Sequence, residues 1–384
     1  MIVSKLKSKL SNYIYNVPGW KTNKKIVVIE SDDWGSERTP TKREYDDMLS
    51  AGLKVDACPF SKYDTVESND DLEHLYSVLS NHKGADGKPP VITANFNLAN
   101  PNYEDIAKNN YECYSYLNYK QTLDKYTNRE KVLELINKGI QENIFFPQYH
   151  SREHLNPYIW LDELKNGNKS LLIGFKNGVF GLSRATGPDI KKFHLASLLF
   201  RNEEEKQLIE NSLQDGYNYF ENIFKYKPES FIAPVYTWNE INEDQIYKLG
   251  INIIQSSYYQ NYFTPYNTTD FKRVFKKVGM KNKNNQTFLV RNSVFEPSIT
   301  PNRNNIDDCL SHVKAAFTMR VPAIISTHRL NYTGGIVENN RIQNVKALDI
   351  LLKKILKKWP DTVFMNSVEL GKLIRNEKSS TAVI

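Results

Sequence analysis

The chain has 384 residues, of which 40% are hydrophobic and 25% charged, and 51 basic against 44 acidic residues give a net charge of +7. This length allows one large α/β barrel or two ordinary domains, and the composition is that of a soluble globular protein. The basic surplus is spread along the chain instead of being concentrated with aromatic residues on one element, which argues against a nucleic-acid-binding protein.

The N-terminal residues 1–23 are predicted to be an extension, either poorly ordered or a basic, aromatic segment that makes peripheral contact with a membrane. Lysines interrupt its apolar start, and no run of 18 apolar residues exists in the chain, so we expect neither a signal peptide nor a transmembrane helix. Cys58, Cys113 and Cys309 lie far apart and form no Cys-x-x-Cys pair, which favours a reducing compartment. The predicted location is the cytoplasm.

Short apolar runs that end abruptly in polar residues recur along the chain and predict buried strands. The clearest lie at 25–35, 143–154, 229–238 and 321–329. Helical patterns are expected at 40–51, 70–80, 151–166, 203–225, 239–249 and 341–358. Alternating strands and helices predict a parallel sheet covered on both faces, either open or closed into a barrel, with the active site after the carboxyl ends of the strands.

Side chains suited to metal binding and acid–base chemistry stand where three of these apolar runs end. They are Asp32, Asp33, His150, His154 and His328. If the strands are parallel, these groups converge on one face of the molecule. Each also has an ordinary interpretation: an aspartate pair in a turn, solvated or capping histidines on a helix, and a histidine bonded to a backbone carbonyl.

The segment HSREH at 150–154 places two histidines four residues apart, which on the first turn of a helix would bring both imidazoles to one face. A zincin protease needs glutamate directly after the first histidine, where Ser151 stands, and no histidine has the His-x-Asp/Glu spacing of the iron facial triad. Two histidines and one distant carboxylate, with a position left open, remain a suitable arrangement for catalytic zinc.

Taken together, these segments resemble the polysaccharide deacetylases of the NodB-homology type, carbohydrate esterase family four. The family motif T-F-D-D is similar to ESDDWG at 30–35, and the motif H-[ST]-x-x-H is matched by HSREH. A later motif, R-x-P-[YFW], corresponds to FIAPVYTW at 231–238, where Pro234 is kept but Ile232 replaces the arginine. The final strand ending in histidine corresponds to IISTHR, and the stretch 71–101 is similar to uncharacterised capsule-cluster members of the family.

This resemblance implies an α/β fold, a distorted (β/α)7 barrel of the NodB-like type. The barrel would occupy residues 24–375, with insertions around 55–125 and 165–205, and residues 376–384 would form a C-terminal tail. The implied activity is hydrolysis of an N-acetyl or O-acetyl group on a sugar, in the biosynthesis of a surface polysaccharide. The implied partner is therefore a carbohydrate.

The resemblance also implies roles for the residues. Asp33, His150 and His154 would bind a divalent metal, Zn²⁺ or another ion, which lowers the pKa of bound water to about 7. Asp32 would be the catalytic base and His328 the general acid that protonates the departing amine or hydroxyl.

Other residues near the motifs are expected to complete the site. The backbone N–H of Val235 would face the oxyanion, and Arg291 or Arg329 would replace the missing motif arginine beside Asp32, unless both are structural. Glu30 would orient a ligand or face elsewhere. The aromatic residues beside the motifs, which would either form a saccharide platform or pack the barrel mouth, are Trp34, Tyr149, Tyr236 and Trp238.

Two alternatives accompany this reading. The chain could be a catalytically inactive glycan-binding protein on the same fold, because Ile232 replaces the motif arginine. It could also be a metal hydrolase of another C–N bond or of a glycosidic bond, for which a glycosidase would need two carboxylates flanking the substrate, drawn from Glu30, Asp32 and Glu296.

Overall fold

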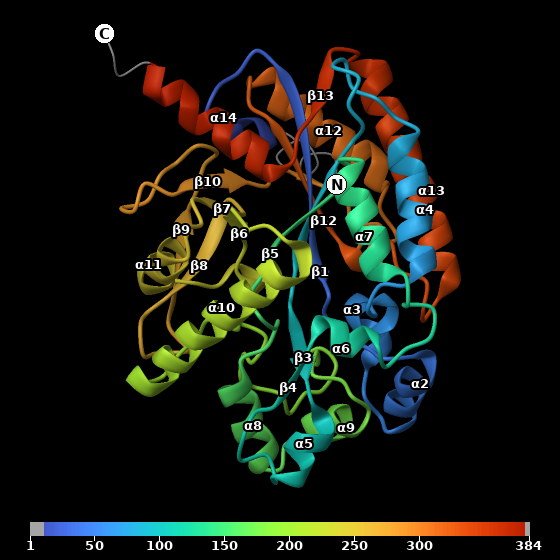
Figure 1. The fold of residues 1–384 in the computed structure, drawn as a ribbon, viewed down its shortest axis with the longest axis vertical. Helices are drawn as coiled ribbons and strands as arrows, with labels where there is room; N and C mark the ends of the chain where they lie inside the picture. The colour runs from blue at the N-terminus through green and yellow to red at the C-terminus, as the bar shows by residue number, and fades with distance from the viewer. Residues whose placement is uncertain (1–10, 381–384) are drawn as a thin grey trace.

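A curled sheet runs through the middle of the molecule, and its strands come from almost every part of the chain (Figure 1). The computed structural model describes residues 11–380. From one edge to the other, the strands are β10 (Thr287–Val290), β7 (Ile253–Ser256), β6 (Ser230–Phe231), β5 (Phe145–Tyr149), β2 (Ile92–Phe96), β1 (Lys25–Trp34), β12 (Ala323–His328) and β11 (Ser293–Val294), with β13 (Thr362–Phe364) beside β1. All neighbouring strands in this sheet are parallel.

The central strands are buried on both faces, as expected for a parallel sheet in an α/β protein. β1 reads KIVVIESDDW, and every residue after the first is buried. β12 reads AIISTH and is buried up to its last residue. Their apolar, β-branched residues pack between helices, whereas the polar residues at their carboxyl ends remain available for a site.

The two edges of the sheet belong to one stretch of chain, because β10 ends at Val290 and β11 begins at Ser293. Consecutive Cα atoms are 3.8 Å apart, so these two residues lie within about 11 Å of each other. β10 pairs with β7, β11 pairs with β12, and the N–H of Arg291 between them donates to the carbonyl of Ser256. The sheet therefore curls until its ends meet at Arg291.

Helices cover the outside of the curled sheet. They are α4 (Asn69–Ser80), α7 (Val132–Gln141), α10 (Glu203–Phe224), α11 (Glu240–Lys248), α12 (Asn305–Thr318), α13 (Glu338–Lys358) and α14 (Ser367–Ser380). In Figure 1, α4, α7 and α13 lie together on one side of the sheet, and α10 and α11 lie on the other. The helices predicted at 70–80, 203–225, 239–249 and 341–358 are confirmed, with ends that differ by at most a few residues.

A smaller group of helices lies beyond the carboxyl ends of the strands, at the bottom of Figure 1. It consists of α2 (Lys42–Ser50), α3 (Pro59–Tyr63), α5 (Tyr103–Lys108), α6 (Tyr119–Leu123), α8 (Pro157–Lys165) and α9 (Lys169–Lys176), with the short antiparallel pair β3 (Ala99–Pro101) and β4 (Tyr116–Asn118). Trp160, Leu171 and Phe180 form part of a separate hydrophobic core for this region. These segments surround the space next to the carboxyl ends of the strands.

The helix expected over 151–166 starts later than predicted. Residues 151–156 form a loop, and α8 begins at Pro157, after Asn156 has capped it by accepting a hydrogen bond from the N–H of the third helical residue. Ser151 has φ +71°, which a right-handed helix does not allow. The two histidines of HSREH are therefore carried by a loop after β5 and not by a helix.

The described part of the N-terminal segment packs against the rest of the molecule. The N–H of Trp20 donates to the carbonyl of Val278 over 2.8 Å, and Asn16 is 3% exposed. The membrane contact expected for residues 1–23 falls partly on residues 1–10, which lie outside the described residues, as do 381–384 of the expected tail. Among residues 11–380, no helix has the length and apolar character needed to cross a membrane. The barrel boundary at residue 24 stays a prediction.

Candidate active site

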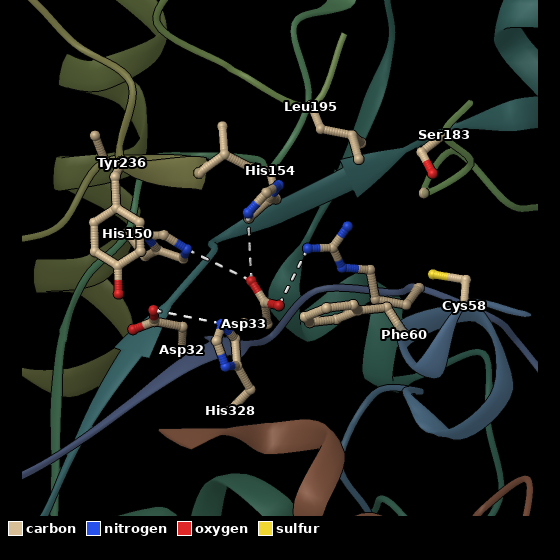
Figure 2. Close-up of a pocket in the computed structure, with 14 residues that line it drawn as sticks. Asp32, Asp33, Cys58, Phe60, His150, His154, Ser183, Leu195, Tyr236 and His328 are labelled. Atoms are coloured by element: carbon tan, nitrogen blue, oxygen red, sulfur yellow. Dashed lines mark hydrogen bonds and ion pairs between the residues drawn. The ribbon is translucent and has the colours of Figure 1, made fainter. Parts of the chain in front are cut away.

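A pocket of about 170 Å³ lies at the carboxyl ends of the central strands (Figure 2). Its lining includes Asp32, Asp33, His150, His154 and His328. The three strands that bring these residues to the pocket are β1, β5 and β12, and they are parallel to one another within the same sheet. The structure therefore brings together all five side chains singled out in the sequence.

Asp33 faces the two histidines that follow β5. Its Oδ1 lies 3.5 Å from Nε2 of His150 and 3.5 Å from Nε2 of His154, and one ligand atom from each residue lies within 4.8 Å of the other two. Asp33 is 2% exposed, and its Oδ1 has no hydrogen-bond partner among the described residues. An unsatisfied buried oxygen is costly. One carboxylate oxygen and two imidazole nitrogens converging in this way fit a divalent cation.

Two neighbouring aspartates point to different places because the backbone of β1 changes conformation between them. Asp33 has φ +73°, and the pairing of β1 with β2 shifts register between Ser31 and Trp34. Asp32 and Glu30 are two residues apart on regular strand, so they share the inner face of the sheet. The change in backbone conformation at Asp33 turns its side chain toward the histidines. The side chain of Asp32 stays on the inner face of the curled sheet, with that of Glu30.

The two histidines both direct Nε2 toward Asp33. Nδ1 of His150 lies 2.8 Å from the carbonyl oxygen of Ile232 and donates to it, which fixes the ring with Nε2 toward Asp33. Burial, and then the nearby Arg38 guanidinium, hold the pKa of His154 well below its ordinary value. Ile232, which stands where the motif of the resembled family has an arginine, thus takes part through its backbone.

Arg38 holds the second oxygen of Asp33, a role that sequence reasoning missed. Its Nη2 donates to Oδ2 of Asp33 over 3.1 Å, and its guanidinium carbon lies 5.6 Å from the ring centroids of Phe60 and Phe180. Burial opposes ionisation of Asp33, but the Arg38 charge and then His154 hold its pKa well below the usual value. Nothing in the spacing of Arg38 distinguishes it from a surface arginine, so the sequence carries no signal for this contact.

Asp32 is bound on both oxygens by Arg291. The two nitrogens Nη1 and Nη2 each donate to one carboxylate oxygen over 2.6 Å, and Nε donates to Glu30 over 2.7 Å. Burial would raise the pKa of Asp32, but Arg291 overcomes it and lowers the pKa to about 2. Arg329, the other candidate, binds Asp64 at 3.0 Å and does not reach Asp32.

His328 lies beside Asp32 and is paired with Glu296. Its Nδ1 lies 2.6 Å from Oε1 of Glu296, and its Nε2 lies 3.8 Å from Oδ2 of Asp32. Burial lowers the pKa of His328, but the Glu296 carboxylate prevails and raises it to about 9. Asn331 donates to the other oxygen of Glu296 over 2.7 Å. Sequence reasoning considered Glu296 only for a glycosidase and missed this pairing.

Strained backbone surrounds the pocket. Val235 and Tyr236 have φ of +51° and +54°, and they join Asp33 and Ser151 among the non-glycine residues in the left-handed region. Each such residue costs about 1–3 kcal/mol and persists where the surrounding structure enforces it, most often at functional sites. Val235 and Tyr236 line the pocket, and the hydroxyl of Tyr236 accepts a hydrogen bond from Arg291 over 3.0 Å.

Two of the expected substrate-contacting residues lie away from the pocket. Trp34 is fully buried, and its ring packs edge-on against Phe145 at 4.8 Å between centroids, so the expectation that it contacts a sugar is wrong. Trp34 is the last residue of β1, and its side chain points away from the pocket into the hydrophobic core. Glu30 is also fully buried, and it binds Arg291 and the hydroxyl of Ser367.

The ion pairs around the pocket contain more carboxylates than cations. When His328 is protonated, ion pairs link six carboxylates to four cations: Glu30, Asp32, Asp33, Asp64, Glu67 and Glu296 against Arg38, Arg291, Arg329 and His328, with Glu67 bound to Arg329 over 2.7 Å. With all six carboxylates ionised, two negative charges would remain uncompensated among these residues, and burial correspondingly raises the pKa of Glu30 and raises that of Asp64 to about 6. Buried net charge is expensive, and one divalent cation would remove it.

No family model matches this chain, and no curated protein matches its sequence. Solved structures with a similar arrangement include a 4-alpha-glucanotransferase from Thermococcus litoralis at 7% identity and a TM-score of 0.43, covering 91% of this chain and 40% of that one. A GH57-type branching enzyme from Pyrococcus horikoshii has 11% identity and a TM-score of 0.43, with coverages of 91% and 70%. A variant of peptidoglycan deacetylase from Bacillus subtilis has 9% identity and a TM-score of 0.35, with coverages of 94% and 96%.

Proposed function

We propose that this protein is a metal-dependent hydrolase that removes an acetyl group from a sugar during the synthesis of a surface polysaccharide. The observation that carries the proposal is the convergence of Asp33, His150 and His154 beside a separate carboxylate and a separate histidine. A deacetylase needs both sets: three ligands for a metal with one face open, and a base and an acid on either side of the reacting carbonyl.

We also assign the fold to the (β/α)7 barrel of the NodB-like type. Taken as one interrupted strand, β10 and β11 close the path through β7, β6, β5, β2, β1 and β12, which makes seven positions around the curled sheet. β13 is left outside this path because it pairs only with β1. Supporting this assignment, Asp32, Asp33, His150, His154 and His328 lie at or just after the carboxyl ends of strands, where barrels place their active sites.

The residues present fit a divalent ion such as zinc, because a buried carboxylate oxygen without a donor faces two Nε2 lone pairs. Bound by Asp33, His150 and His154, such an ion would supply Lewis acidity toward the acetyl carbonyl and would acidify water. Asp32 stays ionised across the neutral range and accepts the proton of the attacking water, in an orientation that Arg291 fixes.

The remaining residues act on the acetyl group and on the leaving group. The backbone N–H of Val235, at the strained turn beside the pocket, is assigned to the developing oxyanion. His328, protonated through its pairing with Glu296, gives its proton to the departing sugar amine or hydroxyl. Tyr236 lines the same pocket and provides an aromatic face next to the substrate.

Release of acetate tests the proposal. Purified protein supplied in turn with zinc and other divalent metals is assayed on N-acetylated nucleotide sugars, lipid-linked saccharides and free oligosaccharides. We expect acetate from one of these classes and a loss of at least about 100-fold in Asp32→Asn, which removes the base. His154→Ala is expected to lose bound metal in elemental analysis. If no substrate class yields acetate with any metal restored, the proposal is wrong.

The inactive glycan-binding protein and the glycosidase find less support than a deacetylase. An inactive glycan-binding protein was suggested by Ile232 in place of an arginine, yet Arg291 supplies a bidentate arginine contact to Asp32. A glycosidase needs two carboxylates flanking the substrate. Glu30 is fully buried and bound to Arg291, and Glu296 is bound to His328, so neither faces the pocket as a free carboxylate.

A further inference from the structure

The N-terminal helix is attached to the rest of the protein by polar and aromatic side chains. We use this name for residues 11–16, which are helical. Asn16 is 3% exposed, and its side-chain oxygen accepts a hydrogen bond from Nδ2 of Asn292 over 2.9 Å. The ring of Tyr15 lies 4.9 Å from that of Tyr258. These contacts fix which side of the helix faces the protein.

The aliphatic side chains at this helix point away from the protein. Ile14 is 57% exposed and Val17 is 53% exposed, the two highest values among the large hydrophobic residues within 11–380. The N–H of Val17 donates to the carbonyl of Ile14 over 3.1 Å, so the two residues lie one turn apart on the same side. A surface helix of a soluble protein normally buries its apolar side and exposes its polar side. Here the arrangement is reversed, which leaves an apolar side available for a partner.

The sequence that precedes this helix has the same spacing of apolar residues. Val3, Leu6 and Leu10 come before Ile14 and Val17 at intervals of three or four residues. Such intervals are typical of one side of an amphipathic helix. The exposed pair is therefore the end of a longer apolar pattern and not two isolated residues.

Aromatic residues extend the exposed surface beyond the helix. β8 (Tyr259–Phe263) and β9 (Phe271–Phe275) form an antiparallel pair of their own, outside the barrel sheet. Tyr259 is 42% exposed and Phe275 is 36% exposed, and their ring centroids lie 6.0 and 6.3 Å from that of Tyr15. Tyrosine is favoured at the boundary between a membrane and water, because its ring is apolar and its hydroxyl is polar.

The same end of the chain is strongly basic. Basic residues occur along the whole chain, but residues 1–24 contain five lysines and no acidic residue, so they hold most of the net charge of +7. Lys272 and Arg273 on β9 add two exposed cations beside the aromatic residues. Apolar side chains accompanied by many lysines and no carboxylates are typical of helices that lie on membranes with anionic lipids. Charge complementarity therefore favours an anionic lipid surface over a neutral partner.

We propose that the N-terminal helix binds the surface of a membrane that contains anionic lipids. Ile14 and Val17 enter the boundary between head groups and acyl chains, and the lysines of residues 1–24 lie against the lipid phosphates. Tyr259 and Phe275 contact the same surface. The protein thus lies on the membrane and does not cross it.

The position of the helix relates this surface to the catalytic pocket. Asn12 and Tyr15 line a second pocket, of about 490 Å³, which shares Tyr236 with the catalytic pocket. A membrane bound by the helix would therefore lie close to the catalytic pocket. Membrane binding would bring the proposed active site to substrates that are held at a lipid surface.

Sedimentation with lipid vesicles tests the proposal. The full-length protein is mixed with vesicles of phosphatidylcholine alone, or of phosphatidylcholine and phosphatidylglycerol in equal parts. We expect binding to the mixed vesicles to be at least about tenfold tighter, because several lysines lie near the anionic surface. Raising the salt concentration should weaken this binding, because salt screens exposed charges.

Ile14→Asp tests the apolar side of the helix. We expect this variant to bind the mixed vesicles about tenfold more weakly and to unfold at the wild-type temperature, because the side chain is exposed. The matched control is Ile342→Asp, which changes charge equally at a residue that is 46% exposed. Ile342 lies on α13, which packs against α4 and α12, and its variant should bind vesicles as the wild type does.

Several results would overturn the proposal. They are absence of binding to the mixed vesicles, equal binding to both kinds of vesicle, and equal binding by Ile14→Asp and either the wild type or Ile342→Asp. A dimer that Ile14→Asp abolishes, observed without vesicle binding, would also overturn it and would assign the apolar side to a second copy of the chain. Vesicle binding requires no turnover, so these outcomes are independent of the hydrolase activity.

Discussion

Asp32 and His328 are each held by one charged partner from the segment between β10 and α12. Burial would raise the pKa of Asp32, but Arg291 lowers it to about 2. Burial would lower the pKa of His328, but Glu296 raises it to about 9. The two groups are therefore kept in opposite protonation states across the neutral range, which is the condition for a base and an acid to work side by side.

Glu296→Gln is expected to move the alkaline limb of the kcat profile to lower pH. His328 acts as an acid only while protonated, so wild-type activity is lost as pH rises through about 9. Without the Glu296 charge, burial still disfavours the imidazolium, and the limb moves down by about one pH unit or more. Activity measured from neutral to alkaline pH checks this, with the exposed Glu204→Gln as control. An unmoved limb would show that His328 is not the acid.

At the scale of elements, the packing of α10 sets the position of the histidine loop. Gly216 lies inside α10, and a Cβ there would come within 2.4 Å of the Tyr149 hydroxyl and 2.9 Å of the Arg152 Cα. Tyr149 and Arg152 stand on either side of His150 in the chain. Only glycine permits this approach, so the helix fixes the backbone on which one candidate metal ligand is carried.

Gly216→Ala is expected to lower both stability and metal affinity. Replacing a helical glycine by alanine ordinarily stabilises a helix by about 1 kcal/mol. Here the added methyl group must displace the backbone that follows β5, so the sign reverses. Thermal unfolding and a metal competition assay check both effects. Asn218→Ala, on the exposed face of the same helix, is the control and should leave metal affinity unchanged. A more stable Gly216→Ala protein with unchanged affinity would contradict this account.

At the scale of the whole molecule, the closure of the sheet and the orientation of the base depend on the same residue. Arg291 lies between β10 and β11, where the two edges meet, and its side chain is 2% exposed. From there it reaches Glu30 and Asp32 on β1. One guanidinium thus joins the closing strand to the central strand and neutralises part of their buried charge.

Arg291→Met is expected to destabilise the fold by about 3–5 kcal/mol, because it leaves two buried carboxylates without a counter-charge. In the wild type the pKa of Asp32 is depressed, so its contribution to stability is present above the unfolded pKa and is lost as pH falls toward about 2. Burial already raises the pKa of Glu30 in the wild type, and in the variant, without the opposing Arg291 charge, it raises the folded-state pKa of both Glu30 and Asp32. The folded variant then binds more protons than the unfolded chain, and its deficit shrinks as pH falls.

Urea unfolding at mildly acidic and mildly alkaline pH measures this difference. The control is Arg43→Met, which removes an arginine whose side chain is 84% exposed and is expected to change stability little at either pH. A deficit of equal size at both pH values would show that the two carboxylates are not the source of the instability.

Much of the architecture was readable from local patterns, because apolar runs predict buried strands and amphipathic runs predict helices. The sequence also indicated that Asp32, Asp33, His150, His154 and His328 would meet, since carboxyl ends of parallel strands share one edge. The predictions from the sequence were wrong where the local backbone departs from a regular helix or strand. The helix after β5 starts only at its proline, and the tryptophan after the aspartates turns into the core.

What the sequence determined by itself was therefore which side chains would gather at the mouth of a parallel sheet. Only the tertiary structure decided which partners hold them, namely Arg38 on Asp33, Arg291 on Asp32 and Glu296 on His328. It also decided that the sheet ends meet and that a second pocket opens beside the first. The physical reason is that periodicity reports the burial of a residue within its own element, whereas an ion pair between distant segments leaves no regular spacing in the chain.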